Sequence, residues 1–312
     1  MIGISNYGAY VPPTRLSLRA LAGSNGGDGG PEKAVAWNDE DAITMAVAAG
    51  RNCLRGIDRD GVDALIFAST SHVFREKQGA ALIARALSLR RDVHTSDLGS
   101  SIRSGLSAVR TALDSVQAGS NRCVLVIASD CRMAAPGTQM EAHLGDGAAA
   151  LLISSEGVIA AIEDGYAIND EIVDVWRSEA DSFSHSWEDR FVVQAGYQPR
   201  ITEAVMGLLE KLGRTASDYD RVALYAPDKR SHALACRSLR LEPAQIQDPL
   251  FGQLGNAGAA FASLQLISAL ERAKAGERLL VASYGDGAEA ISIEVDPAIS
   301  GLGHRRGVAW HL

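Results

Sequence analysis

Apolar residues recur along the chain with helical spacing in some segments and as unbroken runs in others. Four apolar positions, 106, 109, 113 and 116, share one face of a helix over Leu106–Val116. The unbroken apolar run Cys123–Ser129 that follows predicts a buried strand. The same reasoning predicts helices over Ala42–Leu54 and Gln78–Leu89, and strands over Ile2–Ile4, Tyr7–Val11, Val62–Ser69 and within Gly145–Ser154. Because strands alternate with helices, we expect a layered α/β fold whose sheets are covered by helices.

Glycine, proline and acidic residues mark several boundaries of these elements. Gly8 is expected to divide the first strand region into two short strands, which Pro12 and Pro13 close. The Gly-rich stretch Ala22–Pro31 is expected to be a flexible loop, and it lacks the strand and the Lys-Ser/Thr pair of a phosphate loop. Asp39–Asp41 precedes the helix Ala42–Leu54, where the helix dipole favours negative charge.

A segment of mostly small residues, Thr95–Gly105, leads into the helix Leu106–Val116. It predicts a strand–turn–helix elbow. Such an elbow can hold a nucleophile at a helix N-terminus, where the macrodipole and the free N–H groups stabilise a thiolate or an oxyanion. The residue expected at that point is Ile102, which carries no nucleophilic atom.

The second part of the chain repeats the first. Ala112–Gly119, Cys123–Ser129 and Gly145–Ala148 recur in the same order as Ala269–Gly276, Leu279–Ser283 and Gly285–Ala288, the last followed by a strand over Ala290–Val295. The ordered set predicts an internal duplication of two α/β halves, 1–160 and 161–312. Asp146-Gly147 and Asp286-Gly287 belong to the repeat, which favours a structural turn over chemistry at both places.

Composition narrows the classes of partner and ligand. The 312 residues carry a net charge of −8, which argues against nucleic acid or an anionic membrane as the main partner. No apolar run approaches the roughly 20 residues of a membrane span, and the N-terminus lacks the layout of a signal peptide. The four cysteines, Cys53, Cys123, Cys131 and Cys236, include no C-x-x-C pair. They indicate reduced thiols in a cytoplasmic protein and no metal site.

Several stretches carry a resemblance to a known family. They are GAYVP (8–12), EKAV (32–35), DEDAITMAVAAGRN (39–52), STSH (69–72), DLGSSIRSG (97–105), LVIASD (125–130), LGDGAA (144–149), GNAG (255–258) and AGERLLVASYGDGA (275–288). On these residues the chain resembles the thiolase superfamily, and within it the archaeal-type 3-hydroxy-3-methylglutaryl-CoA synthases and ketoacyl-synthase-III-like proteins. The resemblance implies a five-layer α-β-α-β-α fold with two duplicated halves, and a dimer with itself or with another thiolase-like subunit. It also implies a separate zinc-ribbon/OB-fold protein as a candidate partner.

The family's acyl transfer implies three groups: a cysteine at the elbow, a histidine at the thioester and a glutamate as general acid/base. Matched by motif, the cysteine falls on Ile102, the glutamate on Thr70 of Ser69-Thr-Ser-His72, and the histidine on Tyr225 of Leu224-Tyr-Ala-Pro-Asp228. Asn256 alone keeps the family's residue. The resemblance therefore implies a site with its Cys, His and Glu replaced, in which Asn256 and Tyr225 are the remaining catalytic candidates.

Other residues near these motifs have both a structural and a functional interpretation. Ser100, Ser101 and Ser104 favour tight packing over nucleophilic chemistry because no base is expected beside them. Cys131 and His143 are expected to be structural, while His72 keeps the family's position and is a minor candidate for the pocket. Lys229 and Arg230 are either a surface pair or contacts for the phosphates of coenzyme A. A CoA thioester is the candidate ligand, and no tightly bound cofactor is expected.

Three functions remain open at this point. The first is a non-catalytic subunit of an acyl-CoA condensing or cleaving complex. The second is an active acyltransferase that works without a covalent step through Tyr225, Asp228 and Asn256. The third is a protein that binds an acyl-CoA or polyketide-like ligand without turnover.

Overall fold

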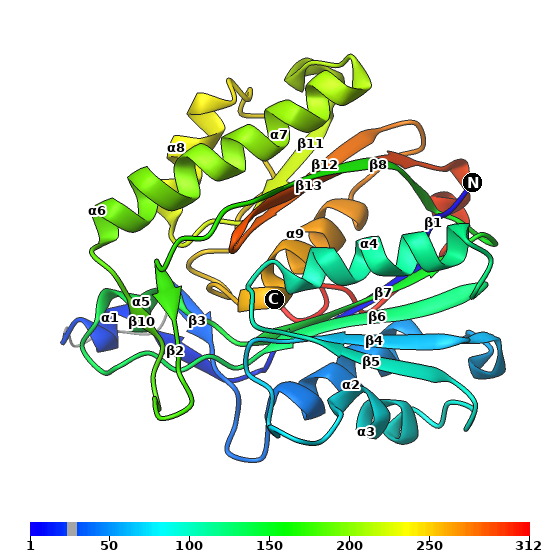
Figure 1. The fold of residues 1–312 in the computed structure, drawn as a ribbon, viewed down its shortest axis with the longest axis horizontal. Helices are drawn as coiled ribbons and strands as arrows, with labels where there is room; N and C mark the ends of the chain where they lie inside the picture. Colours follow the sequence, from blue (N-terminus) through cyan, green and yellow to red (C-terminus); the bar gives the residue numbers. More distant parts are fainter. Residues whose placement is uncertain (24–29) are drawn as a thin grey trace.

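The computed structural model describes residues 1–23 and 30–312 and has a layered α/β architecture (Figure 1). The principal strands are β1 (Gly3–Tyr10), β4 (Ala64–Ala68), β5 (His94–Leu98), β6 (Cys123–Asp130), β7 (Gly147–Ser154), β8 (Ala160–Asn169), β11 (Arg221–Leu224), β12 (Arg278–Tyr284) and β13 (Gly287–Val295). The principal helices are α2 (Ala42–Cys53), α3 (Gly79–Ala86), α4 (Ser104–Gln117), α7 (Gln198–Leu212), α8 (Lys229–Ser238) and α9 (Phe261–Leu270). Shorter elements are α1 (Leu18–Leu21), α5 (Gln139–His143), α6 (Asp189–Phe191) and the strand pairs β2 (Arg15–Ser17) with β3 (Glu32–Ala34) and β9 (Val175–Trp176) with β10 (His185–Ser186).

The strands follow the order β11-β12-β13-β8-β1-β7-β6-β4-β5. Helices α4 and α9 lie between the two parts of this sheet, α2 and α3 cover one outer face, and α7 and α8 cover the other (Figure 1). This is the expected five-layer, thiolase-like α/β fold. Helix α9 is buried along its whole length, as a helix between two sheets must be.

The two parts of the sheet share one pattern of strand pairing. β4 runs parallel to β6, which is antiparallel to β7, which is antiparallel to β1. β11 likewise runs parallel to β12, followed by antiparallel β13 and β8. Where β5 pairs with β4, the other part has only an isolated parallel bridge between Val222 and Ile246. The division at residue 160 stays a prediction; it falls at the first residue of β8.

The expected break at Gly8 is wrong. β1 continues through Gly8, and its only irregularity lies between Ile4 and Asn6. Gly8 serves instead for close packing, because a Cβ there would lie 2.3 Å from the backbone nitrogen of Cys53 and 2.8 Å from the carbonyl oxygen of Ala49, both on α2. The predicted helix Gln78–Leu89 ends earlier, at Ala86, before Ser88 with its positive φ of 57°. Most of the stretch Ala22–Pro31, residues 24–29, lies outside the described residues.

The acidic start of α2 is confirmed. Asp41 is the N-cap residue, and its Oδ1 accepts hydrogen bonds from the backbone N–H groups of Ile43 and Thr44 at 2.9 and 2.8 Å. Thr44 completes a capping box, since its hydroxyl oxygen accepts a bond from the Asp41 N–H at 2.7 Å. The local sequence thus fixes where this outer helix begins.

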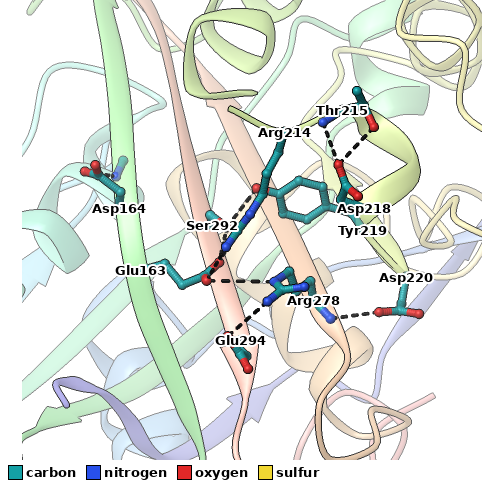
Figure 2. Close-up of polar contacts among 11 residues, drawn as sticks. Glu163, Asp164, Arg214, Thr215, Asp218, Tyr219, Asp220, Arg278, Ser292 and Glu294 are labelled. Atoms are coloured by element: carbon teal, nitrogen blue, oxygen red, sulfur yellow. Dashed lines mark hydrogen bonds and ion pairs between the residues drawn. The ribbon is translucent and has the colours of Figure 1, made fainter. Parts of the chain in front are cut away.

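A polar network braces the sheet against α7 (Figure 2). Glu163 on β8 accepts hydrogen bonds from both terminal guanidinium nitrogens of Arg214, the one from Nη2 at 2.7 Å. It also accepts a hydrogen bond from the Ser292 hydroxyl on β13 at 2.6 Å. Tyr219 donates in turn to the Ser292 hydroxyl oxygen at 2.8 Å. The hydrogen bonds from Arg214 hold the pKa of Glu163 below its usual value. The bidentate pair fixes the end of α7 on the sheet.

Candidate functional site

The predicted elbow is present. β5 ends at Leu98, α4 begins at Ser104, and the turn between them contains Ser100 at a positive φ of 69°. Gly105 permits the close approach of a second loop, because a Cβ there would lie 2.1 Å from the carbonyl oxygen of Ala259. Ile102 is half-buried in this turn and packs against the main hydrophobic core.

The turn between β12 and β13 covers the elbow. Gly285 lies so close that a Cβ there would be 3.0 Å from the backbone nitrogen of Arg103 and 3.1 Å from that of Ile102. It would also lie 2.7 Å from the Ser101 hydroxyl. The N-terminus of α4 therefore keeps the geometry that suits a nucleophile, while the side chain at position 102 is a hydrocarbon.

Thr70 is held by a buried carboxylate. Its hydroxyl donates to Asp130 Oδ2 at 2.8 Å and its backbone N–H to Asp130 Oδ1 at 2.7 Å. Asp130 ends β6, is fully buried, and also accepts the Ser71 hydroxyl at 2.8 Å and the Ala259 N–H at 2.7 Å. Asp130 thus fastens the loop after β4 to the loop before α9. Thr70 is part of this clamp.

Tyr225 and Asn256 are joined directly. Asn256 donates from Nδ2 to the Tyr225 hydroxyl oxygen at 3.1 Å and to the Ala226 carbonyl at 3.2 Å, while its Oδ1 accepts the Gly258 N–H at 3.0 Å. Both side chains are buried. Burial raises the pKa of Tyr225, so its phenol is neutral at physiological pH.

Further aromatic and acidic groups, which the sequence analysis missed, surround Tyr225. Tyr284 stacks on its ring with centroids 6.5 Å apart and donates to Asp174 Oδ2 at 2.5 Å. Tyr197 donates to the Tyr225 carbonyl at 2.8 Å. Burial raises the pKa of Asp174. Tyr284 stands within the SYGDGA motif, so its position was visible in the sequence, but its contact with Tyr225 was not.

Arg132 places a positive charge near Tyr225. It is half-buried just beyond β6, and its positive charge counteracts the rise in the pKa of Tyr225. A Cβ on Gly258 would lie 2.8 Å from Arg132 Cδ and 2.2 Å from Asp130 Oδ2, so this glycine lets the loop before α9 pass between the two side chains.

The loop Asn256–Ala260 is the point at which the predicted positions meet. It contacts Tyr225 through Asn256, the clamp on Thr70 through Ala259, and the elbow through Gly105. The structure therefore gathers positions that lie up to 186 residues apart, from Thr70 to Asn256. Their side chains can donate and accept hydrogen bonds in a buried setting, but none is a nucleophile matched with a base.

The remaining candidates lie around this centre or away from it. His72 packs edge-on against Phe67 at 5.4 Å, with Nε2 3.3 Å from the Leu98 carbonyl, and lines a surface cavity of about 260 Å³ with Phe74 and Asp97. His143 receives the Asn256 N–H at its carbonyl, at 2.8 Å, which is a backbone role. Lys229 and Arg230 are exposed in the first turn of α8, which Asp228 caps through the Ser231 N–H at 2.9 Å.

The serines and the repeated Asp-Gly turns are packed in different ways. Ser101 and Ser104 have buried hydroxyl oxygens for which the described part of the chain offers no hydrogen-bond partner. Asp146 is buried and accepts the Ala36 N–H at 2.8 Å, whereas Asp286 is exposed at a positive φ of 48°. The two turns thus share sequence but not surroundings.

Burial suppresses the ionisation of all four thiols. It raises the pKa of Cys123 and Cys236 to about 11 and that of Cys131 to about 12, and it raises the pKa of Cys53 further. None is an activated thiolate at neutral pH. Among the residues that the structure describes, no three His, Cys, Asp or Glu side chains are grouped to hold a metal ion. Within the same ranges, no helix is long and apolar enough for a membrane span.

Comparison with solved structures supports the fold. The chain superposes on a crystal structure of HMG-CoA synthase complexed with CoA with a TM-score of 0.87 at 20% identity, covering 96% of this chain and 84% of that one. It also superposes on 3-oxoacyl-(acyl carrier protein) synthase III from Pseudomonas aeruginosa, with a TM-score of 0.84 at 18% identity, covering 95% and 98%. At these identities the likeness concerns the fold alone.

Comparison with curated sequences identifies the family, although no protein-family model matches the chain. It is 31% identical to hydroxymethylglutaryl-CoA synthase of Methanosarcina mazei over 97% of its own length and 91% of the relative's. It is 32% identical to the enzyme of the same name from Archaeoglobus fulgidus over 96% and 90%. With this identity along nearly the whole length of both proteins, the chain belongs to the archaeal-type hydroxymethylglutaryl-CoA synthase family of the thiolase superfamily.

Proposed function

We propose that this protein is a thiolase-fold subunit that does not form an acyl-enzyme and acts in an acyl-CoA condensing or cleaving complex. One observation carries the proposal: Ile102 occupies the elbow at the N-terminus of α4, while the surrounding packing of Gly105 and Gly285 is intact. A hydrocarbon side chain cannot attack a thioester. In this proposal the chain keeps the thiolase-like fold, and another subunit of the complex forms the acyl-enzyme.

The other two replaced positions support the same conclusion. The Thr70 hydroxyl donates a hydrogen bond to Asp130, and Tyr225 is a neutral phenol that accepts a hydrogen bond from Asn256. A general acid/base must change its protonation state near the working pH. A threonine hydroxyl does not ionise in that range, and a buried tyrosine with a raised pKa ionises only at alkaline pH. The site is thus arranged to position a ligand and not to move protons.

A CoA thioester is the ligand that this proposal assigns to the protein. Lys229 and Arg230 lie exposed in the first turn of α8 and take part in none of the ion pairs formed within the described ranges. The positive end of the helix dipole adds to their charge. We expect calorimetry to detect acetyl-CoA or acetoacetyl-CoA, and K229Q/R230Q to weaken that binding more than the exposed pair R237Q/R240Q at the other end of α8.

The partner is proposed to be a second thiolase-like subunit. β5 pairs only with β4 and is the last strand of the sheet, so within the described residues its outer edge is unpaired. Phe74, 44% exposed, lines a surface cavity together with Asp97 of β5, and its chain neighbour Val73 is equally exposed. Unpaired strand edges next to apolar side chains favour pairing with another chain. A zinc-ribbon/OB-fold protein is the further partner that the family resemblance suggests.

The oligomer is testable by sedimentation at micromolar concentration. The proposal expects a dimer with a total interface above about 2,000 Å². V73S/F74S should shift it towards monomer, while the control M206S, on the exposed face of α7, should not. A wild-type monomer that also fails to associate with a homologous subunit would contradict the proposal.

A second function rests on the density of polar groups around Tyr225. Asn256, Tyr284 and Arg132 could stabilise a developing negative charge without a covalent intermediate. Turnover of acetyl-CoA with acetoacetyl-CoA by the isolated chain, lost in Asn256→Ala, would favour this acyltransferase over the non-acylating subunit.

A further inference from the structure

A second basic site lies at the far end of α2. A cavity of about 400 Å³ is lined by Arg51, Arg55 and Arg59 from one stretch of chain and by Arg306 from the C-terminal segment. No acidic side chain is among the residues that line it. The described structure thus concentrates four guanidinium groups around one hollow in a chain whose net charge is −8.

This cavity is separate from the site around Ile102. The first turn of α2, at Asp41, lies towards Cys131, which follows the clamp residue Asp130. The cavity is at the last turn of the same helix. Twelve helical residues rise about 18 Å, so the two sites lie at opposite ends of the outer layer.

The arginines are held in place but not neutralised. Arg59 donates to the Leu87 carbonyl at 2.9 Å, and Arg305, adjacent to Arg306, donates to the Arg55 carbonyl at 3.0 Å. Arg306 lies over the Trp310 ring, 5.0 Å from its centroid. Within residues 1–23 and 30–312 none of these arginines forms an ion pair with an acid. These contacts orient the guanidinium groups of Arg59 and Arg306 and leave their charge available.

One of the four guanidinium groups also carries an unused donor. The Nε atom of Arg306 is buried, and the described part of the chain supplies no hydrogen-bond acceptor for it. A buried donor without a partner costs free energy, which an anion bound beside Arg306 would recover.

Helix electrostatics explains only part of this arrangement. Arg51, in the last turn of α2, is favoured by the negative end of the helix dipole. That argument does not reach Arg59 or Arg306, which lie outside the helix. The C-terminal end of α8 gives a comparison. Arg237 and Arg240 stand there at positions like those of Arg51 and Arg55 on α2, but neither lines one of the two cavities described above.

We propose that this cavity binds a small molecule carrying two or more linked phosphate groups. Arginine offers a planar fork of donors that matches phosphate oxygens in a bidentate way, and several such forks around one hollow suit a polyphosphate better than a single charge. A volume of about 400 Å³ falls within the range of small-molecule sites. The site adds to the function proposed above and does not depend on it.

Calorimetry on the full chain tests the assignment with pyrophosphate as the probe, and with phosphate and sulfate as comparisons. Pyrophosphate should bind at least about tenfold more tightly than either single anion, and saturating acetyl-CoA should leave that binding in place. R51Q/R55Q should weaken it about tenfold or more, because both arginines are exposed and their replacement leaves the core intact. The matched pair R237Q/R240Q at the end of α8 should bind as the wild type does.

Five outcomes overturn the proposal. The first four are no pyrophosphate binding by the wild type, unchanged affinity in R51Q/R55Q, an equal loss in R237Q/R240Q, and tighter binding of a hexaglutamate peptide than of pyrophosphate. The fourth result would assign the arginines to an acidic protein partner. Loss of pyrophosphate binding on addition of acetyl-CoA, with R51Q/R55Q unchanged, would place the anion in the CoA site and would contradict the proposal as well.

Discussion

Asn256 donates a hydrogen bond from Nδ2 to the phenolic oxygen of Tyr225 over 3.1 Å, inside the core. The group that this asparagine positions is a neutral phenol, because burial raises the pKa of Tyr225. The pair joins the loop before α9 to the end of β11. It therefore contributes to the fold whether or not the site turns over a substrate.

Tyr225→Phe should lower the free energy of unfolding by about 1 kcal/mol, the usual cost of one neutral buried hydrogen bond. The loss stays small because the Asn256 Nδ2 group keeps its bond to the Ala226 carbonyl at 3.2 Å. Urea denaturation measures it, and Tyr219→Phe, which removes one bond to Ser292, is the matched control. A loss above about 3 kcal/mol in the Tyr225 variant alone would contradict this view of the pair.

Thr70→Val should cost about 1.5–3 kcal/mol, because it removes a donor to the buried Asp130 carboxylate at nearly constant side-chain size. Thr70→Ser keeps the hydroxyl and should cost well under that amount. The comparison of the two variants in urea isolates the hydrogen bond from packing. Equal effects would show that the clamp does not depend on the side chain at position 70.

His232 should make stability depend on pH. Burial lowers its pKa to about 4 in the folded protein, against about 6.5 in the unfolded chain. Between these values the unfolded state binds more protons, so stability is complete above pH 6.5 and falls as the pH drops towards 4. The shift corresponds to at most about 3 kcal/mol.

His232→Leu removes the titrating group, and its unfolding free energy should therefore change less between pH 7 and pH 4.5 than that of the wild type. Urea denaturation at several pH values measures the difference. Parallel curves for the two proteins would rule out the buried neutral histidine as the cause.

Local sequence patterns predicted the helices and strands, whereas the hydrogen-bond partners in the site depend on tertiary contacts. α2 and β6 follow from helical periodicity and an apolar run, and both occur within a few residues of their predicted ends. Gly8 misled because its role is set by α2, whose backbone lies against it and is more than 40 residues away in sequence. No spacing in one sequence reveals such an approach.

In the interior of the site, too, the sequence predicted positions but not the contacts between them. The positions of Ile102, Thr70, Tyr225 and Asn256 followed from motifs, and the structure brings them around one loop. Their partners did not follow, since Asp130 meets Thr70 across 60 positions and Ala259 across 129. The placement of Asp174, Tyr284 and Arg132 around Tyr225 depends on how β6, β11 and β12 pack together. The assignment of Lys229 and Arg230 to CoA, and the division of the chain at residue 160, stay predictions.

Ile102→Cys should fold, at a cost of about 1–2 kcal/mol for the lost methylenes in this half-buried turn. The new thiol stands at the N-terminus of α4, which lowers the pKa of a thiolate. It should therefore react with iodoacetamide faster than Cys53, Cys123 or Cys236, whose pKa values burial raises. It should bring no condensation activity, because Thr70 and Tyr225 supply no general acid/base.

Thr111→Cys is the matched control for that labelling. It is exposed on the same helix, beyond the first turn, so its thiol is accessible but lies farther from the positive end of the dipole. Peptide mapping over a range of pH should give a lower midpoint for Ile102→Cys than for Thr111→Cys. An unreactive thiol in a folded Ile102→Cys variant would show that the elbow is closed.

Intact-mass spectrometry after incubation with acetyl-CoA or acetoacetyl-CoA tests the central claim most directly. The Methanosarcina mazei synthase, treated in parallel, is the reference for conditions that support acyl transfer. The account predicts that the wild-type chain keeps its unmodified mass, because Ile102 cannot form a thioester and the four native thiols are held protonated by burial. A stable acyl adduct on any residue of the wild type would contradict it.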